Sequence, residues 1–151
     1  MKKRDQVILV ALDDSISSRA VIDALSILPL CKDECVLHLV HFLRKPSASE
    51  DLMGKKFSAE QPRRMMSVLE KARDNLAAIG FNLDKINMNL ITESYPTVAD
   101  GIIDQYQKND FDMVIIGRKR MSKAEEFVMG DPSIKLIRAL EGASILVIKS
   151  K

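Results

Sequence analysis

The sequence lacks several features that would point to particular classes of protein. It has no tryptophan, two cysteines and an aromatic content of only 5%. No apolar run approaches the roughly 18 residues that a membrane-spanning helix needs, so we expect no membrane partner. The run VILVALDD reaches acidic residues too soon for the apolar region of a signal peptide. These absences predict a cytoplasmic protein.

The few cysteines and the small net charge exclude further classes. Cys31 and Cys35 form the segment CKDEC without a second cysteine pair or a histidine cluster, so they cannot complete a tetrahedral zinc site. His38 and His41 stand three apart on a predicted strand and point to opposite faces, which makes a structural role for each the better explanation. The net charge of +2 is too small to indicate a broad nucleic-acid surface. We therefore expect no bound metal and no nucleic-acid partner.

What the sequence contains is a series of short apolar runs separated by helical patterns. Apolar positions that recur at spacings of three and four predict four helices. These apolar patterns begin at Ala20, at Met65 (in a helix expected at 61–79), at Val98 and at Ile134. Residues 44–60 carry Pro, Gly and Ser without a steady period and are predicted to form a long loop. The apolar runs predict strands at 6–12, 35–43, 86–92, 112–117 and 144–149.

Two helix starts are marked by proline. Pro96 is expected in the first turn of the helix that contains Val98. Asp131 is expected as the N-cap of the last helix, with Pro132 in its first position.

The alternation of strands and helices predicts one α/β domain over residues 1–151, with a parallel sheet and helices on both faces. Ligands of such folds bind beyond the carboxyl ends of the strands, where the strand order reverses. This rule directs attention to Asp13 after the first strand and to Gly117 after the fourth. Asp13, Asp14 or Ser15 would cap the helix that follows the first strand.

Four segments together resemble the universal stress protein family: ILVALDDS, LVHFL, DFDMVIIG and ASILVIKS. Their order and spacing cover essentially the whole chain. The resemblance implies an open five-stranded parallel sheet of order 3-2-1-4-5, which is Rossmann-like and similar to the adenine nucleotide alpha hydrolases. It also implies a stress-response role and a homodimer formed through the last strand, residues 143–149. Unpaired backbone groups on that apolar edge favour pairing, whereas Lys149 and Lys151 could act as gatekeepers that oppose it.

Family members that bind ATP carry the motif G-x-x-G, nine further residues, and Gly followed by Ser or Thr. On this sequence the first and third glycines are Gly117 and Gly130, but Arg120 and Asp131 stand at the other two positions. Arg120 adds bulk where the backbone would approach a phosphate. A helix start attracts anions such as phosphate, but Asp131 places its own negative charge there and would repel a phosphate. The motif is therefore degenerate.

Two interpretations of this degenerate site remain open. In the first, ATP binding is weakened or lost, no cofactor is used, and the protein is a non-catalytic dimeric regulator or a module that binds an unknown protein partner. In the second, the cations of loop 118–123 grip ATP or AMP with their side chains, as in a regulator or a slow ATPase. No nucleophile, base or metal set supports an enzyme of another class. The residues of the site are Asp13, Gly117, Arg118, Arg120, Gly130, Asp131 and Ser133.

Overall fold

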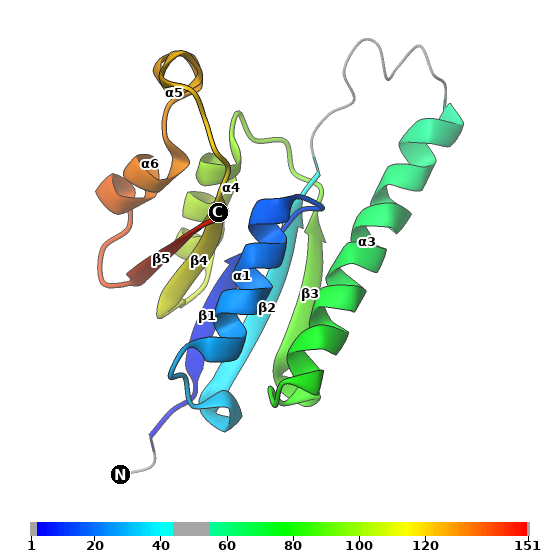
Figure 1. Ribbon diagram of the computed structural model, residues 1–151, viewed down its shortest axis with the longest axis vertical. Coiled ribbons are helices and arrows are strands. Elements are labelled where there is room, and N and C mark those ends of the chain that lie inside the picture. The colour runs from blue at the N-terminus through cyan, green and yellow to red at the C-terminus, as the bar shows by residue number, and fades with distance from the viewer. Residues whose placement is uncertain (1–2, 44–54, 151) are drawn as a thin grey trace.

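The computed structural model describes residues 3–43 and 55–150 and contains one open parallel sheet (Figure 1). The strand order is β3-β2-β1-β4-β5, and every pairing is parallel. The predicted fold class is thus confirmed, and each predicted strand agrees with the structure to within a residue. The strands are β1 (Gln6–Ala11), β2 (Cys35–Phe42), β3 (Ile86–Ile91), β4 (Met113–Arg118) and β5 (Ser144–Lys149).

Helices cover both faces of the sheet. On one face lie α1 (Ile16–Ile27) and α3 (Lys55–Ala78), and on the other lie α4 (Val98–Lys108) and α6 (Pro132–Ala139) (Figure 1). The short helix α5 (Lys123–Met129) stands between β4 and α6, and single 3-10 turns, η1 (Lys32–Glu34) and η2 (Leu83–Lys85), precede β2 and β3. None of the described helices is both long enough and apolar enough to cross a membrane.

The central strands contribute to two separate apolar layers because successive side chains point to opposite faces. Ile8 of β1 packs beneath α1 and α3 with Leu25 and Leu76. Its neighbour Leu9 packs on the other face with Leu136 of α6. All five side chains are completely buried. Burial of each contributes about 1.5–3 kcal/mol to the stability of the fold, relative to an exposed side chain. Burial on both faces explains why these strands are continuous apolar runs in the sequence.

The predicted loop 44–60 was wrong in its last part. Residues 44–54 lie outside the described residues, but α3 begins at Lys55, so residues 55–60 are helical. These residues span less than two turns, so they show no apolar period, although Lys, Ala and Glu favour a helix. Pro62 lies inside the helix rather than at its start.

The predicted place of Pro96 in the first turn of α4 was also wrong. Thr97 is the N-cap, because its Oγ1 accepts a hydrogen bond from the Asp100 backbone N–H at 3.2 Å. A threonine hydroxyl at this position accepts a hydrogen bond from a free backbone N–H of the first turn. Proline has no side-chain oxygen and cannot accept this bond. Pro96 therefore precedes the cap.

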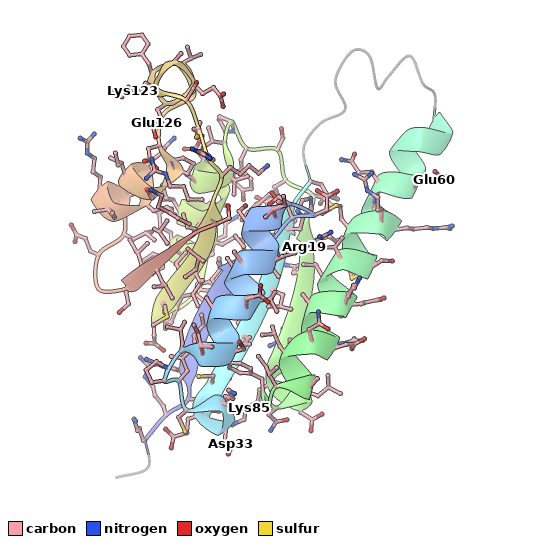
Figure 2. All side chains as sticks on the ribbon, viewed as in Figure 1. Arg19, Asp33, Glu60, Lys85, Lys123 and Glu126 are labelled. Atoms are coloured by element: carbon pink, nitrogen blue, oxygen red, sulfur yellow. The ribbon has the colours of Figure 1, made fainter. Side chains whose placement is uncertain are left out.

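The two ends of the sheet carry different polar groups (Figure 2). At the amino ends of the strands, Lys85 donates to the Asp33 carbonyl oxygen at 2.7 Å and pairs with Asp5 at 2.8 Å. Lys123 and Glu126, on α5, lie at the opposite end of the molecule. There the turn after β1 and the segment after β4 meet, because β1 and β4 are neighbours in the sheet. This is the end at which ligands of such folds bind.

Candidate functional site

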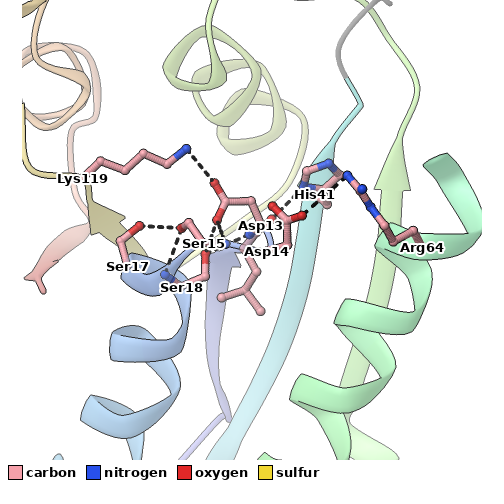
Figure 3. A network of polar contacts seen from close by, with 9 residues as sticks. Asp13, Asp14, Ser15, Ser17, Ser18, His41, Arg64 and Lys119 are labelled. Atoms are coloured by element: carbon pink, nitrogen blue, oxygen red, sulfur yellow. Dashed lines mark hydrogen bonds and ion pairs between the residues drawn. The ribbon is translucent and has the colours of Figure 1, made fainter. Parts of the chain in front are cut away.

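The turn after β1 is held by Asp13 and two serines (Figure 3). Asp13 Oδ1 accepts hydrogen bonds from the Ser15 backbone N–H at 2.8 Å and the Ser18 hydroxyl at 2.9 Å. The Asp13 backbone N–H donates to Ser18 Oγ at 2.8 Å. Ser15 is the N-cap of α1, since its hydroxyl oxygen accepts from the Ser18 backbone N–H. Of the three residues that the sequence offered as a cap, the structure selects Ser15, and Asp13 instead orders the turn.

The second carboxylate oxygen of Asp13 faces the segment after β4. Lys119 Nζ lies 3.4 Å from Asp13 Oδ2, and the Lys119 side chain is 65% exposed (Figure 3). Burial alone would raise the pKa of Asp13, but the hydrogen bonds from Ser15 and Ser18 and the nearby Lys119 hold it below its ordinary value. Asp13 is therefore an anion at neutral pH, and among the described residues the ion-pair partner of its outer oxygen, Lys119, is distant and exposed.

Asp14 and the two histidines have structural contacts. Asp14 Oδ2 lies 3.5 Å from Arg64 Nη2 of α3. His41 Nδ1 lies 2.8 Å from the Leu12 carbonyl oxygen, and because a carbonyl only accepts, this nitrogen carries the proton. His38 packs edge-on against Phe111, with ring centroids 5.4 Å apart. The structure therefore provides a packing or hydrogen-bonding reason for both histidines.

Gly117, the first glycine of the motif, is explained by close packing. A Cβ atom at this position would lie 2.6 Å from the Ser17 carbonyl oxygen in the first turn of α1. Among the described residues, positive φ angles occur at Gly80, Gly130 and Gly142 only. The close approach of α1 is by itself a sufficient reason for glycine at position 117.

Gly130 and Arg120 have different backbone requirements. Gly130 has a φ of +75°, and its N–H donates to the Glu126 carbonyl oxygen at 2.8 Å, which ends α5. That conformation favours glycine. Arg120 is exposed and has no positive φ, so the turn after β4 does not use a glycine-only conformation at the second motif position.

The carboxylate of Asp131 is surrounded by hydrogen-bond donors. Its Oδ1 accepts from the Ser133 backbone N–H at 2.9 Å and the Ser133 hydroxyl at 2.6 Å, and its Oδ2 lies 2.7 Å from Arg118 Nη2. The Asp131 side chain is only 9% exposed. The hydrogen bonds from Ser133 hold the pKa of Asp131 below its ordinary value against the effect of burial, and Arg118 adds to them. Asp131 is the N-cap of α6, as the sequence predicted.

Arg118 has a second carboxylate partner. Its Nη2 donates to Glu126 Oε1 at 2.6 Å, and Glu126 comes from α5. Sequence reasoning treated this segment as a loop and missed Glu126. A signal was present, because Ser122 followed by Glu125 is a capping pattern, and the Ser122 hydroxyl oxygen accepts from the Glu125 backbone N–H at 3.1 Å.

The donors around Asp131 are those that a phosphate would use at a helix start, namely a backbone N–H, a hydroxyl and a guanidinium. A further anion would meet the Asp131 charge. At ~4 Å the repulsion between two unit charges costs about 1 kcal/mol in water and about 4 kcal/mol at an effective dielectric of 20. Within the part of the chain that the structure describes, no three His, Cys, Asp or Glu side chains are placed to hold a metal ion.

Comparison with known proteins agrees with this architecture. The model of the universal stress protein family matches residues 6–149. No curated protein sequence matches the chain.

Three solved structures illustrate the likeness in fold. A universal stress protein in complex with cAMP has a TM-score of 0.70 at 16% identity, over 99% of this chain and 100% of that one. A member of the family from Burkholderia pseudomallei has a TM-score of 0.64 at 18% identity, over 96% of both chains. The universal stress protein from Archaeoglobus fulgidus in complex with dAMP has a TM-score of 0.60 at 18% identity, over 95% of this chain and 98% of that one. At such identities the likeness shows the fold alone.

Proposed function

The chain belongs to the universal stress protein family, and on this premise we propose that it is a non-catalytic, dimeric stress-response regulator or partner-binding module with weakened or lost ATP binding. The observation that carries the proposal is the Asp131 carboxylate, which takes the donors of Ser133 and Arg118. The partner is a protein, and the compartment is the cytoplasm. The unpaired thiols of Cys31 and Cys35 support a reducing compartment.

A triphosphate would have to displace Asp131 to reach these donors. Asp131 also caps α6, so its displacement would leave the first turn of that helix without its side-chain acceptor. A phosphate would also compete with two carboxylates for Arg118 Nη2, since this nitrogen contacts both Glu126 and Asp131. Each step costs free energy before any phosphate contact is gained.

Calorimetric titration with ATP and Mg²⁺ tests the proposal. The unmodified protein should bind weakly or not at all, and the double variant Arg120→Gly with Asp131→Ser should gain affinity. Serine keeps a cap at position 131 while removing the charge. Asp14→Ser is the matched control, because it removes a carboxylate of the same site region that does not touch these donors. Submicromolar ATP binding by the unmodified protein would refute the proposal.

A second candidate function is a regulator that binds AMP, or ATP with slow hydrolysis, through loop 118–123. The long, exposed contact between Asp13 and Lys119 favours it, since a ribose hydroxyl could replace Lys119 there. Relatives of the same fold are described in complex with cAMP and dAMP. Affinities for adenosine, AMP, ADP and ATP separate the two candidates. If the affinity falls as phosphates are added, the first candidate is supported, because the Asp131 carboxylate excludes phosphate. If the affinity rises as phosphates are added, the second candidate is supported, because loop 118–123 binds the phosphates.

The proposed homodimer uses β5, which lies at the edge of the sheet. The side chains of residues 145–148 are apolar and only half-buried, and α6 beside this strand exposes Ile134 by 48% and Ile137 by 62%. An unpaired apolar edge with apolar neighbours supports pairing with a second copy.

Sedimentation at about 50 µM, a concentration that populates weak pairs, should show a dimer. Val147→Pro, which removes a backbone donor from β5, and Ile137→Lys should both weaken it. Ile27→Lys is the control for the latter, because Ile27 is an exposed apolar residue of α1. A monomeric unmodified protein, or equal weakening by Ile27→Lys, would argue against this interface.

A further inference from the structure

The helix α5 buries none of its described side chains. It stands beyond the carboxyl end of β4, and its Phe127 and Val128 are 92% and 81% exposed (Figure 1). The next helix, α6, is of similar length but buries Leu136 completely in the core. Helices shorter than about 12–15 residues are marginal in isolation. The seven residues of α5 therefore need a contact with the rest of the protein to stay helical.

One short ion pair provides this contact. Glu126 Oε1 on α5 lies 2.6 Å from Arg118 Nη2 at the end of β4, and both side chains are partly buried (Figure 2). The other hydrogen bonds of α5, as far as the structure describes them, close within the helix and its two caps. In the segment that leads to α5, Lys119 has only the long, exposed pair with Asp13. Among the described residues, Glu126 is therefore the group that holds α5 to the sheet.

The two ends of α5 allow it to move while the sheet stays in place. Residues 119–121, which precede its cap, have no regular secondary structure. After α5 comes Gly130, and glycine changes its backbone conformation at little cost. Beyond this glycine, α6 is fixed by the buried Leu136. Segments with few buried contacts open locally at a lower free energy than the whole fold.

We propose that α5 is an autoinhibitory strap, which opens by local unfolding and whose Glu126 occupies Arg118 while the strap is closed. Arg118 Nη2 is the nitrogen that contacts both Glu126 and Asp131. Opening removes one of these two carboxylates, so an anion at Arg118 then competes with Asp131 alone. By linkage, opening and anion binding favour each other. The inference rests on the proposed function, in which engaged donors weaken anion binding, and adds the regulation of those donors.

Hydrogen exchange of the full chain without ligand tests the strap. The amides of α5 should exchange at least about tenfold faster than those of α6 and should respond less to low urea, because they open without the sheet. Glu126→Gln should speed exchange in α5 by about threefold, as expected for the loss of a partly exposed ion pair, and should leave the strands unchanged.

Glu125→Gln is the matched control for exchange. It removes the same charge from α5 without a contact to Arg118, and glutamine keeps the capping interaction with Ser122. Protection of α5 equal to that of the strands, no protection of α5 at all, or an equal effect of the two variants overturns the proposal.

Calorimetric titration with ATP and Mg²⁺ tests the autoinhibition. In the Asp131→Ser protein, adding Glu126→Gln should raise the ATP affinity by about threefold, and adding Glu125→Gln should raise it less. Equal affinities after the two additions, or binding by neither protein, overturn the autoinhibitory role. The exchange experiment needs no ligand, so a failure of the strap is distinguishable from a failure of the proposed function, which is measured by ATP binding to the unmodified protein.

Discussion

The turn after β1 and the segment after β4 meet at the same point of the sheet, and each places an aspartate there. Among the described residues, the outer oxygen of Asp13 has Lys119 as its ion-pair partner. The distance from Lys119 Nζ to Asp13 Oδ2 is 3.4 Å, and the Lys119 side chain is 65% exposed. Asp131 is 9% exposed and has three donors at 2.6–2.9 Å. An aspartate is thus accessible to a ligand in the turn after β1, whereas the aspartate in the segment after β4 is fully engaged by hydrogen-bond donors.

The difference shows that exposure and donor number decide whether a carboxylate can give way to a ligand. Exposed ion pairs contribute about 0–1 kcal/mol, so replacing Lys119 at Asp13 costs little. Several short hydrogen bonds around a nearly buried carboxylate contribute more, and breaking them leaves Arg118 with fewer partners. Four predictions test this comparison, from the largest expected effect to the smallest.

The packing contact between Gly117 and Ser17 joins the two regions, and a mutation there is expected to have the largest effect on stability. Gly117→Ala places a Cβ 2.6 Å from the Ser17 carbonyl oxygen, so it should lower the free energy of unfolding by about 2–3 kcal/mol. Gly130→Ala is the control, because its Cβ meets no atom within 4 Å and only the φ of +75° is strained, at a cost of about 1–2 kcal/mol. Urea denaturation measures both. A smaller effect at Gly117 than at Gly130 would contradict the packing explanation.

Removing the buried carboxylate should have the next largest effect. Asp131→Ala removes the cap of α6 and one partner of Arg118, and should lower the free energy of unfolding by about 1–2 kcal/mol. Asp131→Ser keeps a capping hydroxyl and should cost less. If the two variants are equally stable in urea, the capping role assigned to Asp131 is wrong.

The response to acid should depend on Asp131. Its pKa in the folded protein is lowered, so the folded state favours the charged form, and this contribution to stability is present above about pH 4. It is lost as the pH falls through the lowered pKa. Asp131→Ser should therefore lose less stability than the unmodified protein between about pH 5 and pH 3. An equal loss of stability in the two proteins between these pH values, measured by urea denaturation, would contradict this.

Removing the exposed cation should have the smallest effect. Lys119→Gln should change the free energy of unfolding by less than about 1 kcal/mol, because its pair with Asp13 is long and exposed. Arg118→Gln should cost more, since it leaves the Glu126 and Asp131 carboxylates without their shared cation. The order of the two variants in urea denaturation is the decisive result, and a reversed order would contradict the comparison.

Local sequence was sufficient for the strands and for the cap of α6. The strands could be predicted because parallel strands buried on both faces must be apolar throughout, as Ile8 and Leu9 illustrate. Asp131 could be predicted as a cap because a capping residue acts on the donors of the next few residues. The resemblance to the universal stress protein family supplies the ATP-binding motif, and its spacing then places Arg120 and Asp131 at two of the motif positions.

Tertiary structure decided what these positions do. Gly117 looks like a phosphate-binding glycine in the sequence, but the atom that requires it is the carbonyl oxygen of Ser17, which lies 100 positions away in the chain. Arg118 looks like a free cation, but Glu126 and Asp131 both contact it once α5 has formed. Propensity and spacing describe neighbours along the chain, whereas close approach and charge pairing depend on which segments the fold brings together. For that reason the sequence alone determined the sheet and pointed to a candidate site, and only the folded structure decided that the donors around Asp131 are already engaged.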